Sequence, residues 1–357
     1  MNLKLSTTIL MLSALSPAMG AAPSSAQAAA ASPSVVPVTV KDFPRAESHM
    51  YFAKSVRDGA FGRLRHGRAP VAIDQQSVIR MNRDTLYSSG VFDLDAGPVT
   101  IVLPDTRGRF MSLLVVDEDH YARPVVYAPG RFVFARESVG SRYMFAAVRT
   151  LADPNDPADL KLANAAQDRI QVLQAAPGRL ELPEWDAAAR DRIREALLVL
   201  AAQSGATNEE RFGARDKVDP VQHLLFTAAG WGGNPREAAV YDSAIPASND
   251  GTTVHRLTVR EVPVDGFWSI SVYNAKGFFE KNALDSYSLN SLTATPNQDG
   301  SFTVQFGGCT ATTANCLVTP PGWSYVVRLY RPRRPILDGT WRFPEAVASP
   351  DRDGAAR

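Results

Sequence analysis

Two groups of short apolar runs flank a helical middle segment, and this order of patterns constrains the fold more than any other feature of the chain. The runs are rich in β-branched and aromatic residues, and each ends at Gly, Pro, Asn or Asp. Such spacing is typical of antiparallel sandwiches or barrels. It predicts strands at 91–94, 99–103, 110–116, 124–127, 131–134 and 143–148, and at 253–260, 267–273, 286–290, 301–306 and 325–330. Asn297–Gly300 predicts a hairpin turn.

Helical periodicity occupies the middle segment and one stretch before the first strands. Asp42, with Pro44 in the first turn, predicts a helix that ends at Gly59. Asp156 and Pro157 begin a helix whose apolar stripe reaches Leu173. Two more helices are expected, one from Trp185 to about Gly205 and one from Asp219 to Gly230. The fold class is therefore mainly β with a helical insert (α+β), in which a helical segment joins two antiparallel β-domains.

The same patterns suggest where the parts of the chain begin and end. We expect a signal peptide at 1–28, an extended lead-in at 29–42, an N-terminal helix plus β-domain at 43–150, a helical segment at 151–237, a second β-domain at 238–346 and a tail at 347–357.

The N-terminus has the composition of an export signal. Lys4 precedes an apolar run from Leu5 to Leu15, which is shorter than the roughly 20 residues that a membrane span requires. Ala26-Gln27-Ala28 follows as a small-x-small cleavage site. We therefore expect a soluble periplasmic or secreted protein without a membrane span. Loss of Lys4 would change the formal charge from +1 to zero, which argues against nucleic acid as a partner.

The only two cysteines, Cys309 and Cys316, lie close together. In an exported protein such a pair predicts a disulfide. A zinc site is the alternative, but no histidine lies near the pair in the sequence.

Two stretches resemble a bacterial exported family that combines the domains of unknown function 1254 and 1214. The first is Arg80-Met81-Asn82-Arg83-Asp84-Thr85-Leu86-Tyr87-Ser88, and the second includes Gly266-Phe267-Trp268-Ser269, Tyr287-Ser288-Leu289 and Val327-Arg328-Leu329-Tyr330-Arg331-Pro332. The resemblance implies two β-sandwich domains, the second like a jelly roll, and no assigned reaction. Where relatives carry Asn-Trp-Leu-Pro, this chain has Asn315-Cys316-Leu317-Val318.

Motifs of several enzyme classes are missing from the sequence. It contains no G-x-S-x-G elbow, no H-E-x-x-H pair, no G-x-G-x-x-G and no P-loop. We therefore expect no cofactor. Whether the protein is an enzyme stays open, and a hydrolase is the class we would expect if it is one.

Arg80, Asn82, Asp84 and Tyr87 form the first candidate site. On a strand, Arg80, Asn82 and Asp84 would share one face and combine a guanidinium, an amide and a carboxylate. That set suits a sugar, a carboxylate or a polar ester, and burial of Asp84 would make it a possible general base. Alternatively, the Asn and Asp cap a turn and Arg pairs with Asp.

Asp117, Asp119 and His120 form the second candidate, at the end of an apolar strand. They are a weak candidate for a cation site, because their oxygens suit Ca²⁺ or Mn²⁺, and His120 is a second possible base. The alternative is an acidic loop with a solvated histidine.

Trp231, in a Gly-rich loop between the domains, is the aromatic residue that we expect to be exposed to a ligand. The basic run from Arg328 to Arg334 is expected to form ion pairs rather than an anion site.

These observations favour a protein that binds a small polar or carbohydrate-like ligand in a crevice between two β-domains. Arg80, Asn82, Asp84, Tyr87 and Trp231 would line that crevice. One alternative is an esterase- or glycosidase-like hydrolase with Asp84 or His120 as base. Another is a non-catalytic envelope or interaction protein.

Overall fold

The first group of apolar runs folds into two sheets around one apolar core in the computed structural model, which describes residues 35–76, 79–204 and 211–349. One sheet has the strand order β1-β2-β7-β4-β5 and the other the order β6-β3-β8. Their buried side chains, among them Phe92, Ile101 and Leu113, form a single cluster. The strands are β1 (Arg65–His66), β2 (Thr85–Asp93), β3 (Val99–Leu103), β4 (Met111–Val116), β5 (Val126–Tyr127), β6 (Gly130–Phe134), β7 (Tyr143–Leu151) and β8 (Gln171–Leu173).

The second group forms another two-sheet sandwich. Its sheets have the orders β12-β11-β15-β9 and β14-β13-β10-β16, and Trp268, Phe306 and Trp323 belong to the core that they share. The strands are β9 (Ala239–Ala244), β10 (His255–Val259), β11 (Trp268–Tyr273), β12 (Ser288–Asn290), β13 (Phe302–Phe306), β14 (Cys316–Leu317), β15 (Ser324–Tyr330) and β16 (Val347–Ala348). All pairs are antiparallel except β13 with β14.

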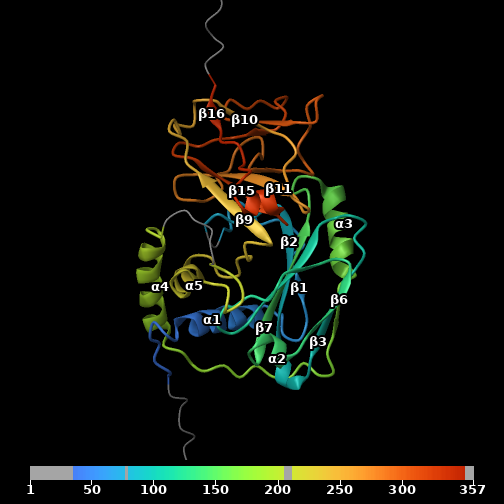
Figure 1. The fold of residues 1–357 in the computed structure, drawn as a ribbon, viewed down its shortest axis with the longest axis vertical. Coiled ribbons are helices and arrows are strands. Elements are labelled where there is room, and N and C mark those ends of the chain that lie inside the picture. Colours follow the sequence, from blue (N-terminus) through green and yellow to red (C-terminus); the bar gives the residue numbers. More distant parts are fainter. Residues whose placement is uncertain (1–34, 77–78, 205–210, 350–357) are drawn as a thin grey trace, which may run out of the picture. The chain divides into compact units, whose positions relative to one another are not determined.

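Helices supplement the sheets, so the predicted class, mainly β with a helical insert, is confirmed. α1, α4 and α5 share an apolar cluster of Phe43, Leu197 and Leu225 and lie together in Figure 1. The helices are α1 (Phe43–Arg57), η1 (Leu94–Ala96), α2 (Arg136–Val139), α3 (Pro157–Asp168), α4 (Ala187–Ala201), α5 (Pro220–Ala229) and α6 (Arg334–Leu337). None of the helices in the described ranges is long and apolar enough to cross a bilayer.

Two local predictions were wrong because distant pairing decides the structure there. The helix expected to reach Leu173 ends at Asp168, since residues 171–173 pair with β3 as strand β8. Asn297–Gly300 does form a turn, in which the Gly300 N–H donates to the Asn297 carbonyl over 3.0 Å. However, the flanking strands β12 and β13 belong to different sheets, so this turn does not close a hairpin.

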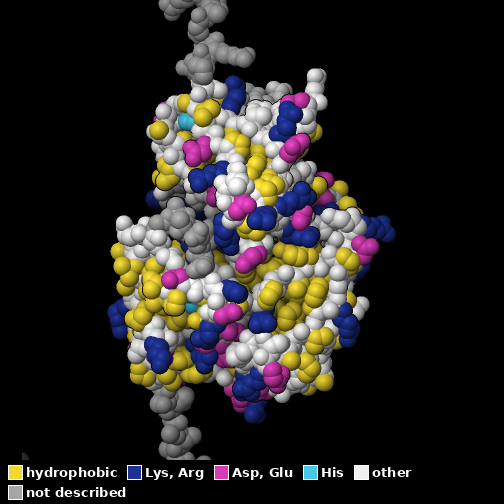
Figure 2. All heavy atoms as spheres, viewed as in Figure 1, with side chains coloured by type: hydrophobic (Ala, Val, Ile, Leu, Met, Phe, Trp, Pro, Cys, Tyr) yellow, Lys and Arg dark blue, Asp and Glu magenta, His cyan; other side chains and the backbone are white. Residues whose placement is uncertain are grey.

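The ends of the chain are described only in part. The proposed signal peptide, the lead-in before residue 35 and the tail beyond residue 349 lie outside the described residues. The remaining lead-in pairs with the segment before α4 through a bridge between Val36 and Trp185. Val347 and Ala348, assigned to the tail from the sequence, instead pair with β10. On the face drawn in Figure 2, acidic and basic side chains are interspersed.

Candidate functional site between the two sandwiches

One sheet of the second sandwich has a polar face. Asn290, Ser269, Arg328 and Tyr241 lie opposite one another on β12, β11, β15 and β9. Because side chains alternate along a strand, their neighbours Ile270 and the other apolar residues point into the sandwich core. Ser269, Asn290 and Arg328 are nevertheless buried. Another part of the chain therefore covers this polar face.

The segment before β2 provides part of that cover. Asn82 Nδ2 donates to the hydroxyls of Tyr330 over 3.1 Å and Tyr87 over 3.4 Å. Asn82 Oδ1 accepts the backbone N–H of Asp84 over 2.7 Å, which makes a local turn. Strand β2 begins only at Thr85, so Arg80, Asn82 and Asp84 do not share a strand face as predicted. Arg80 itself is exposed, and its carbonyl accepts a hydrogen bond from Arg328.

Asp84 has no exposed surface. Its Oδ1 accepts from Asn290 Nδ2 over 3.2 Å, whereas Oδ2 has no hydrogen-bond partner among the described residues. Burial raises the pKa of this carboxyl, and the nearby Arg328 guanidinium offsets the rise only in part. A carboxyl enclosed in this way cannot reach a substrate, so the geometry does not support Asp84 as the base of a hydrolase.

Arg328 lies buried at the centre of the same face. Its Nη1 donates to Ser271 Oγ over 2.9 Å, and its Nη2 donates to the Tyr273 hydroxyl over 2.7 Å and to the Arg80 carbonyl over 3.0 Å. Within the described chain it forms no ion pair, so the ion-paired interpretation of the basic run is wrong for Arg328. The expectation holds for Arg333, which pairs with Asp265 over 2.7 Å.

A matching row of polar side chains crosses the first sandwich. Tyr87, Arg149, Ser112 and Tyr127 lie opposite one another on β2, β7, β4 and β5. The Arg149 guanidinium lies over the Tyr87 ring, 5.4 Å from its centroid. Arg149 also donates to Asn234 Oδ1 over 2.9 Å and to the Gly232 carbonyl over 3.0 Å. Arg149 is only 6% exposed, whereas Tyr87 is 37% exposed and opens the row to solvent.

Phenols from both sandwiches meet Arg149. Asn82 links Tyr87 to Tyr330, and Asn234 Nδ2 donates to the Tyr241 hydroxyl over 2.9 Å. The Tyr330 ring is fixed by stacking on Phe267, with centroids 4.2 Å apart. We define the tyrosine–arginine cluster as Tyr87, Arg149, Tyr241 and Tyr330 together with the amides of Asn82 and Asn234.

The phenols of the cluster differ in acidity. Burial raises the pKa of Tyr87, but Arg149 and the hydrogen bonds from its neighbours outweigh burial, so that its net pKa lies below the ordinary value of 10.0. Burial raises the pKa of Tyr330 well above that value. The pKa of Arg149 is itself raised, because the three phenols outweigh the effect of burial. The cluster therefore places the permanently charged Arg149 beside Tyr87, a phenol whose pKa is lowered.

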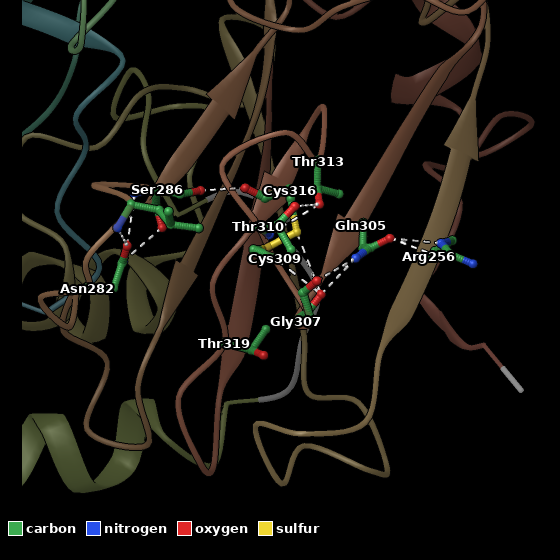
Figure 3. The surroundings of a disulfide bond; sticks show 12 residues. Arg256, Asn282, Ser286, Gln305, Gly307, Cys309, Thr310, Thr313, Cys316 and Thr319 are labelled. Atoms are coloured by element: carbon green, nitrogen blue, oxygen red, sulfur yellow. Dashed lines mark hydrogen bonds between the residues drawn. A yellow bond between two sulfur atoms is a disulfide. The ribbon is translucent and has the colours of Figure 1, made fainter. Parts of the chain in front are cut away.

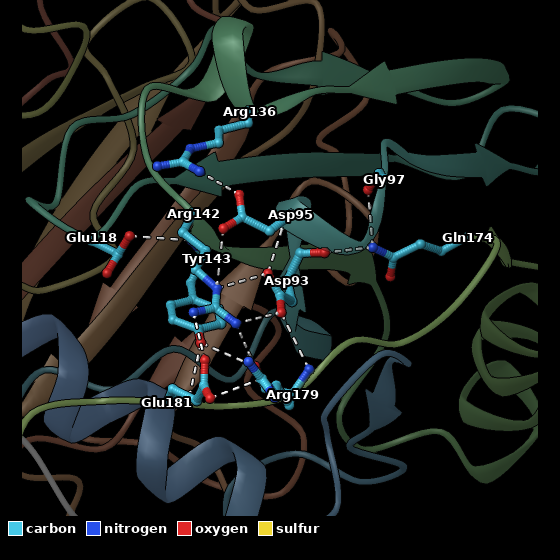
Figure 4. A network of polar contacts seen from close by, with 10 residues as sticks. All are labelled: Asp93, Asp95, Gly97, Glu118, Arg136, Arg142, Tyr143, Gln174, Arg179 and Glu181. Atoms are coloured by element: carbon cyan, nitrogen blue, oxygen red, sulfur yellow. Dashed lines mark hydrogen bonds and ion pairs between the residues drawn. The ribbon is translucent and has the colours of Figure 1, made fainter.

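Arg149, like Arg328, is buried without an ion pair in the described chain, in contrast to Arg142. Arg142 has three acidic partners: it binds Asp93 at 3.0 Å, Asp95 at 3.5 Å and Glu181 at 2.8 Å (Figure 4). Arg149 has no carboxylate within ion-pair distance in the described chain, although it is more buried. A buried cation without a counter-ion costs free energy unless something compensates it. An anion from outside the chain is one such compensation.

A pocket of about 230 Å³ lies beside the cluster, between the two sandwiches. Phe110 and Tyr127 of the first sandwich and Gly266 and Arg331 of the second line it. The Arg331 guanidinium lies 4.5 Å from the centroid of the Tyr127 ring. No residue of the cluster lines the pocket. Tyr127 lies in the same row as Arg149, with Ser112 between them, and Phe110 contacts the Tyr330 ring with centroids 5.6 Å apart, so the pocket adjoins the cluster.

Within the described chain, Trp231 and His120 adjoin the cluster only through Gly232, whose carbonyl accepts from Arg149 and whose N–H donates to His120. Trp231 is half-buried: it stacks on Tyr51 with centroids 4.5 Å apart and donates to Ser48 Oγ over 3.0 Å. It does not form the exposed wall that we predicted. His120 is buried, and both ring nitrogens are engaged, by Thr227 Oγ1 at 2.9 Å and by the Gly232 N–H at 2.8 Å. The geometry therefore does not support His120 as a base.

The acidic loop does not assemble a cation site. Asp119 pairs with Arg45 at 2.8 Å and Arg215 at 3.1 Å, and Asp117 accepts backbone N–H groups of its own turn. No three His, Cys, Asp or Glu side chains in residues 35–76, 79–204 and 211–349 are arranged to hold a metal ion.

The predicted disulfide between Cys309 and Cys316 is present (Figure 3). It lies in the second sandwich, where Cys316 belongs to β14, and the two residues are seven positions apart. It links β14 to the segment that follows β13, the strand with which β14 pairs.

Sequence patterns did not reveal Arg149, Tyr241 and Tyr330. Each looks like an ordinary strand residue, and only the pairing of β2 with β7 and of β9 with β15 brings them to one place. A weak signal was available: a charged residue within the apolar strand that ends at Leu151.

Comparisons with known proteins agree with the sequence resemblance. Residues 61–174 match the family model described as "Protein of unknown function (DUF1254)", and residues 239–334 match "Protein of unknown function (DUF1214)". None of the curated proteins matches the chain.

Two solved structures are similar to the chain. The crystal structure of the VPA0106 protein from Vibrio parahaemolyticus is 18% identical, with a TM-score of 0.67, over 87% of this chain and 98% of that one. An uncharacterized protein from Burkholderia cenocepacia is 12% identical, with a TM-score of 0.49, over 82% and 84%. The Vibrio protein shares the fold.

Proposed function

The chain belongs to the proteins that join an N-terminal DUF1254 domain to a C-terminal DUF1214 domain, and from this premise we propose that it is an exported protein that binds a small organic anion of sugar-like polarity between its two β-sandwiches. Arg149 would hold the negative charge. Asn82, Asn234 and the phenols of the cluster would hold the hydroxyl groups of the ligand.

The observation that carries this proposal is the Arg149 guanidinium. It is nearly buried, it lies at the junction of the two sandwiches, and it has no acidic partner in the described chain. The exposed edge of Tyr87 provides access from solvent. A guanidinium presents a planar fork of N–H donors that matches a carboxylate, which makes a carboxylate the favoured ligand group.

The composition of the surrounding residues favours a hydroxylated ligand over a purely apolar acid. Amides and phenols both donate and accept hydrogen bonds, as sugar hydroxyls do, and aromatic faces such as Tyr127 stack on sugar rings. The pocket at Tyr127 adds room for part of such a ligand.

A thermal-shift experiment tests the proposal. D-Glucuronate should raise the melting temperature of the mature protein, whereas D-glucose and inorganic phosphate should raise it less. Arg149→Gln should abolish the shift caused by glucuronate. Arg334→Gln removes a positive charge from a side chain that is 93% exposed and should keep the shift. A wild-type protein unaffected by all three probes would contradict ligand binding and favour an interaction protein.

Export belongs to the same proposal, and it rests on the sequence pattern of residues 1–28. The disulfide is compatible with an oxidising compartment. Mass spectrometry of the protein from its native host should give a mature chain that begins at residue 29, in the periplasm or the medium. An intact Met1 in the cytoplasm would contradict it.

A further inference from the structure

We infer that the tyrosine–arginine cluster catalyses β-elimination of a hexuronate substituted at oxygen 4, with Tyr87 as the residue that transfers the proton. This inference rests on the proposed function, because the same Arg149 would bind the carboxylate of the substrate. It adds a reaction and a substrate class to the binding site.

β-Elimination beside a carboxylate makes two demands on a site. The negative charge that develops on the carboxylate must be neutralised, and a base must lie beside the carbon that bears the acidic hydrogen. Arg149 meets the first demand. It donates to Asn234 and to the Gly232 carbonyl and interacts with the Tyr87 hydroxyl, and a guanidinium carries five N–H donors in all.

Tyr87 meets the second demand by position. It lies directly opposite Arg149 on the neighbouring strand, so a carboxylate bound by Arg149 would bring its α-carbon towards the phenol. As a whole residue Tyr87 is 37% exposed, against 6% for Arg149, and Asn82 Nδ2 lies 3.4 Å from its enclosed hydroxyl, where the amide can stabilise a phenolate.

The different acidities of Tyr87 and Tyr330 support this assignment. Environments that push the pKa values of two neighbouring groups apart assign them different roles. Arg149 holds the pKa of Tyr87 below its ordinary value, which favours the phenolate, whereas burial keeps Tyr330 protonated. Tyr330 shares Asn82 with Tyr87 and acts as a positioning residue, because it is itself buried.

The step balances without any co-reactant. The Tyr87 phenolate takes the proton from carbon 5 of the uronate. The electron pair of that C–H bond forms the double bond between carbons 4 and 5, and the bond from carbon 4 to oxygen 4 breaks with its pair on oxygen. That oxygen takes the proton back from Tyr87. The products are an unsaturated uronate and an alcohol, and water is not consumed.

The experiment uses the mature protein with digalacturonate and, as a neutral disaccharide, lactose. We expect ultraviolet absorbance of a conjugated unsaturated acid from digalacturonate only. The masses of the two products should add up to the mass of the substrate, whereas hydrolysis would add the mass of one water. Tyr87→Phe should slow elimination at least about 100-fold, because general acid–base catalysis contributes about that much.

Two controls separate this inference from the proposed function. Tyr51→Phe removes a phenol that lies outside the cluster, against Trp231, and should keep full elimination. Circular dichroism and a cooperative melting transition without ligand show whether Tyr87→Phe folds. A shift in the wild type without elimination would overturn the inference and leave binding intact. Elimination at an unchanged rate in Tyr87→Phe would overturn the role of Tyr87, and the absence of any shift would contradict the proposed function itself.

Discussion

At the scale of single residues, burial changes the pKa of side chains such as Asp117. Asp117 was expected to be a possible cation ligand, yet it is a turn residue whose Oδ1 accepts the N–H groups of Asp119 over 2.9 Å and Tyr121 over 2.8 Å. Burial raises the pKa of Asp117 to about 6, in spite of these hydrogen bonds. A raised pKa means that the folded state favours the protonated carboxyl.

This shift predicts how the stability of Asp117→Asn depends on pH. The folded pKa of about 6 exceeds the ordinary 3.8, so the stabilising contribution of the protonated form is complete below pH 3.8 and is lost as pH rises through 6. At pH 7.5 the variant should be more stable than the wild type by up to about 3 kcal/mol, since each unit of pKa corresponds to about 1.4 kcal/mol. At pH 3.5 this gain should vanish. Urea unfolding at both pH values measures the difference, and a gain of equal size at both would contradict the prediction.

At the scale of elements, local signals were predictable and long-range pairing was not. Asp156 was expected to cap a helix and Asp219 to begin one, and each accepts a backbone N–H at the start of its helix, over 2.8 Å in both cases, whereas Asp42, also expected to cap a helix, makes no such side-chain bond. A cap needs only the next three residues, so sequence is sufficient. The end of α3 was missed because β8 pairs with a strand about 70 residues earlier, and such a contact leaves no local pattern.

The candidate site shows the same limit. The motif that contains Asn82 and Tyr87 was recognised, because it lies in one stretch of sequence. Its partner Arg149 was not, because the contact depends on the register of β2 against β7. Trp231 packs on Tyr51 and Ser48 of α1 and is not an exposed aromatic wall, so its contact with a ligand stays a prediction.

The disulfide is the element-scale feature with the clearest effect on stability. It joins Cys316 in β14 to Cys309, which follows β13, and so closes a short loop between two paired strands (Figure 3). Replacing both cysteines by serine should lower the free energy of unfolding by about 2.5 kcal/mol, the chain-entropy estimate for so short a loop. Reduction of the wild type should have the same effect. An unchanged unfolding midpoint after either treatment would contradict this prediction.

At the scale of the whole molecule, the buried residues inside the two sandwiches differ in polarity from those at the interface between them. Each sandwich encloses an apolar core, whereas the interface combines apolar contacts such as Phe110 on Phe267 with buried polar groups such as Arg149 and Arg328. Replacing such groups with apolar residues often costs nothing in stability or even adds to it. For Arg149, the proposed binding role would account for such a group between the sandwiches. The boundaries of the two domains, 43–150 and 238–346, stay predictions.

The central claim is that Arg149 makes this interface an anion site, and titration calorimetry tests it most directly. D-Glucuronate and D-glucose differ in the carboxylate that Arg149 would bind. We predict that glucuronate binds the wild type at least about tenfold more tightly than glucose, a difference of about 1.4 kcal/mol, and that Arg149→Gln removes this preference. Equal affinities of the wild type for both sugars, or an undiminished preference in Arg149→Gln, would contradict the claim.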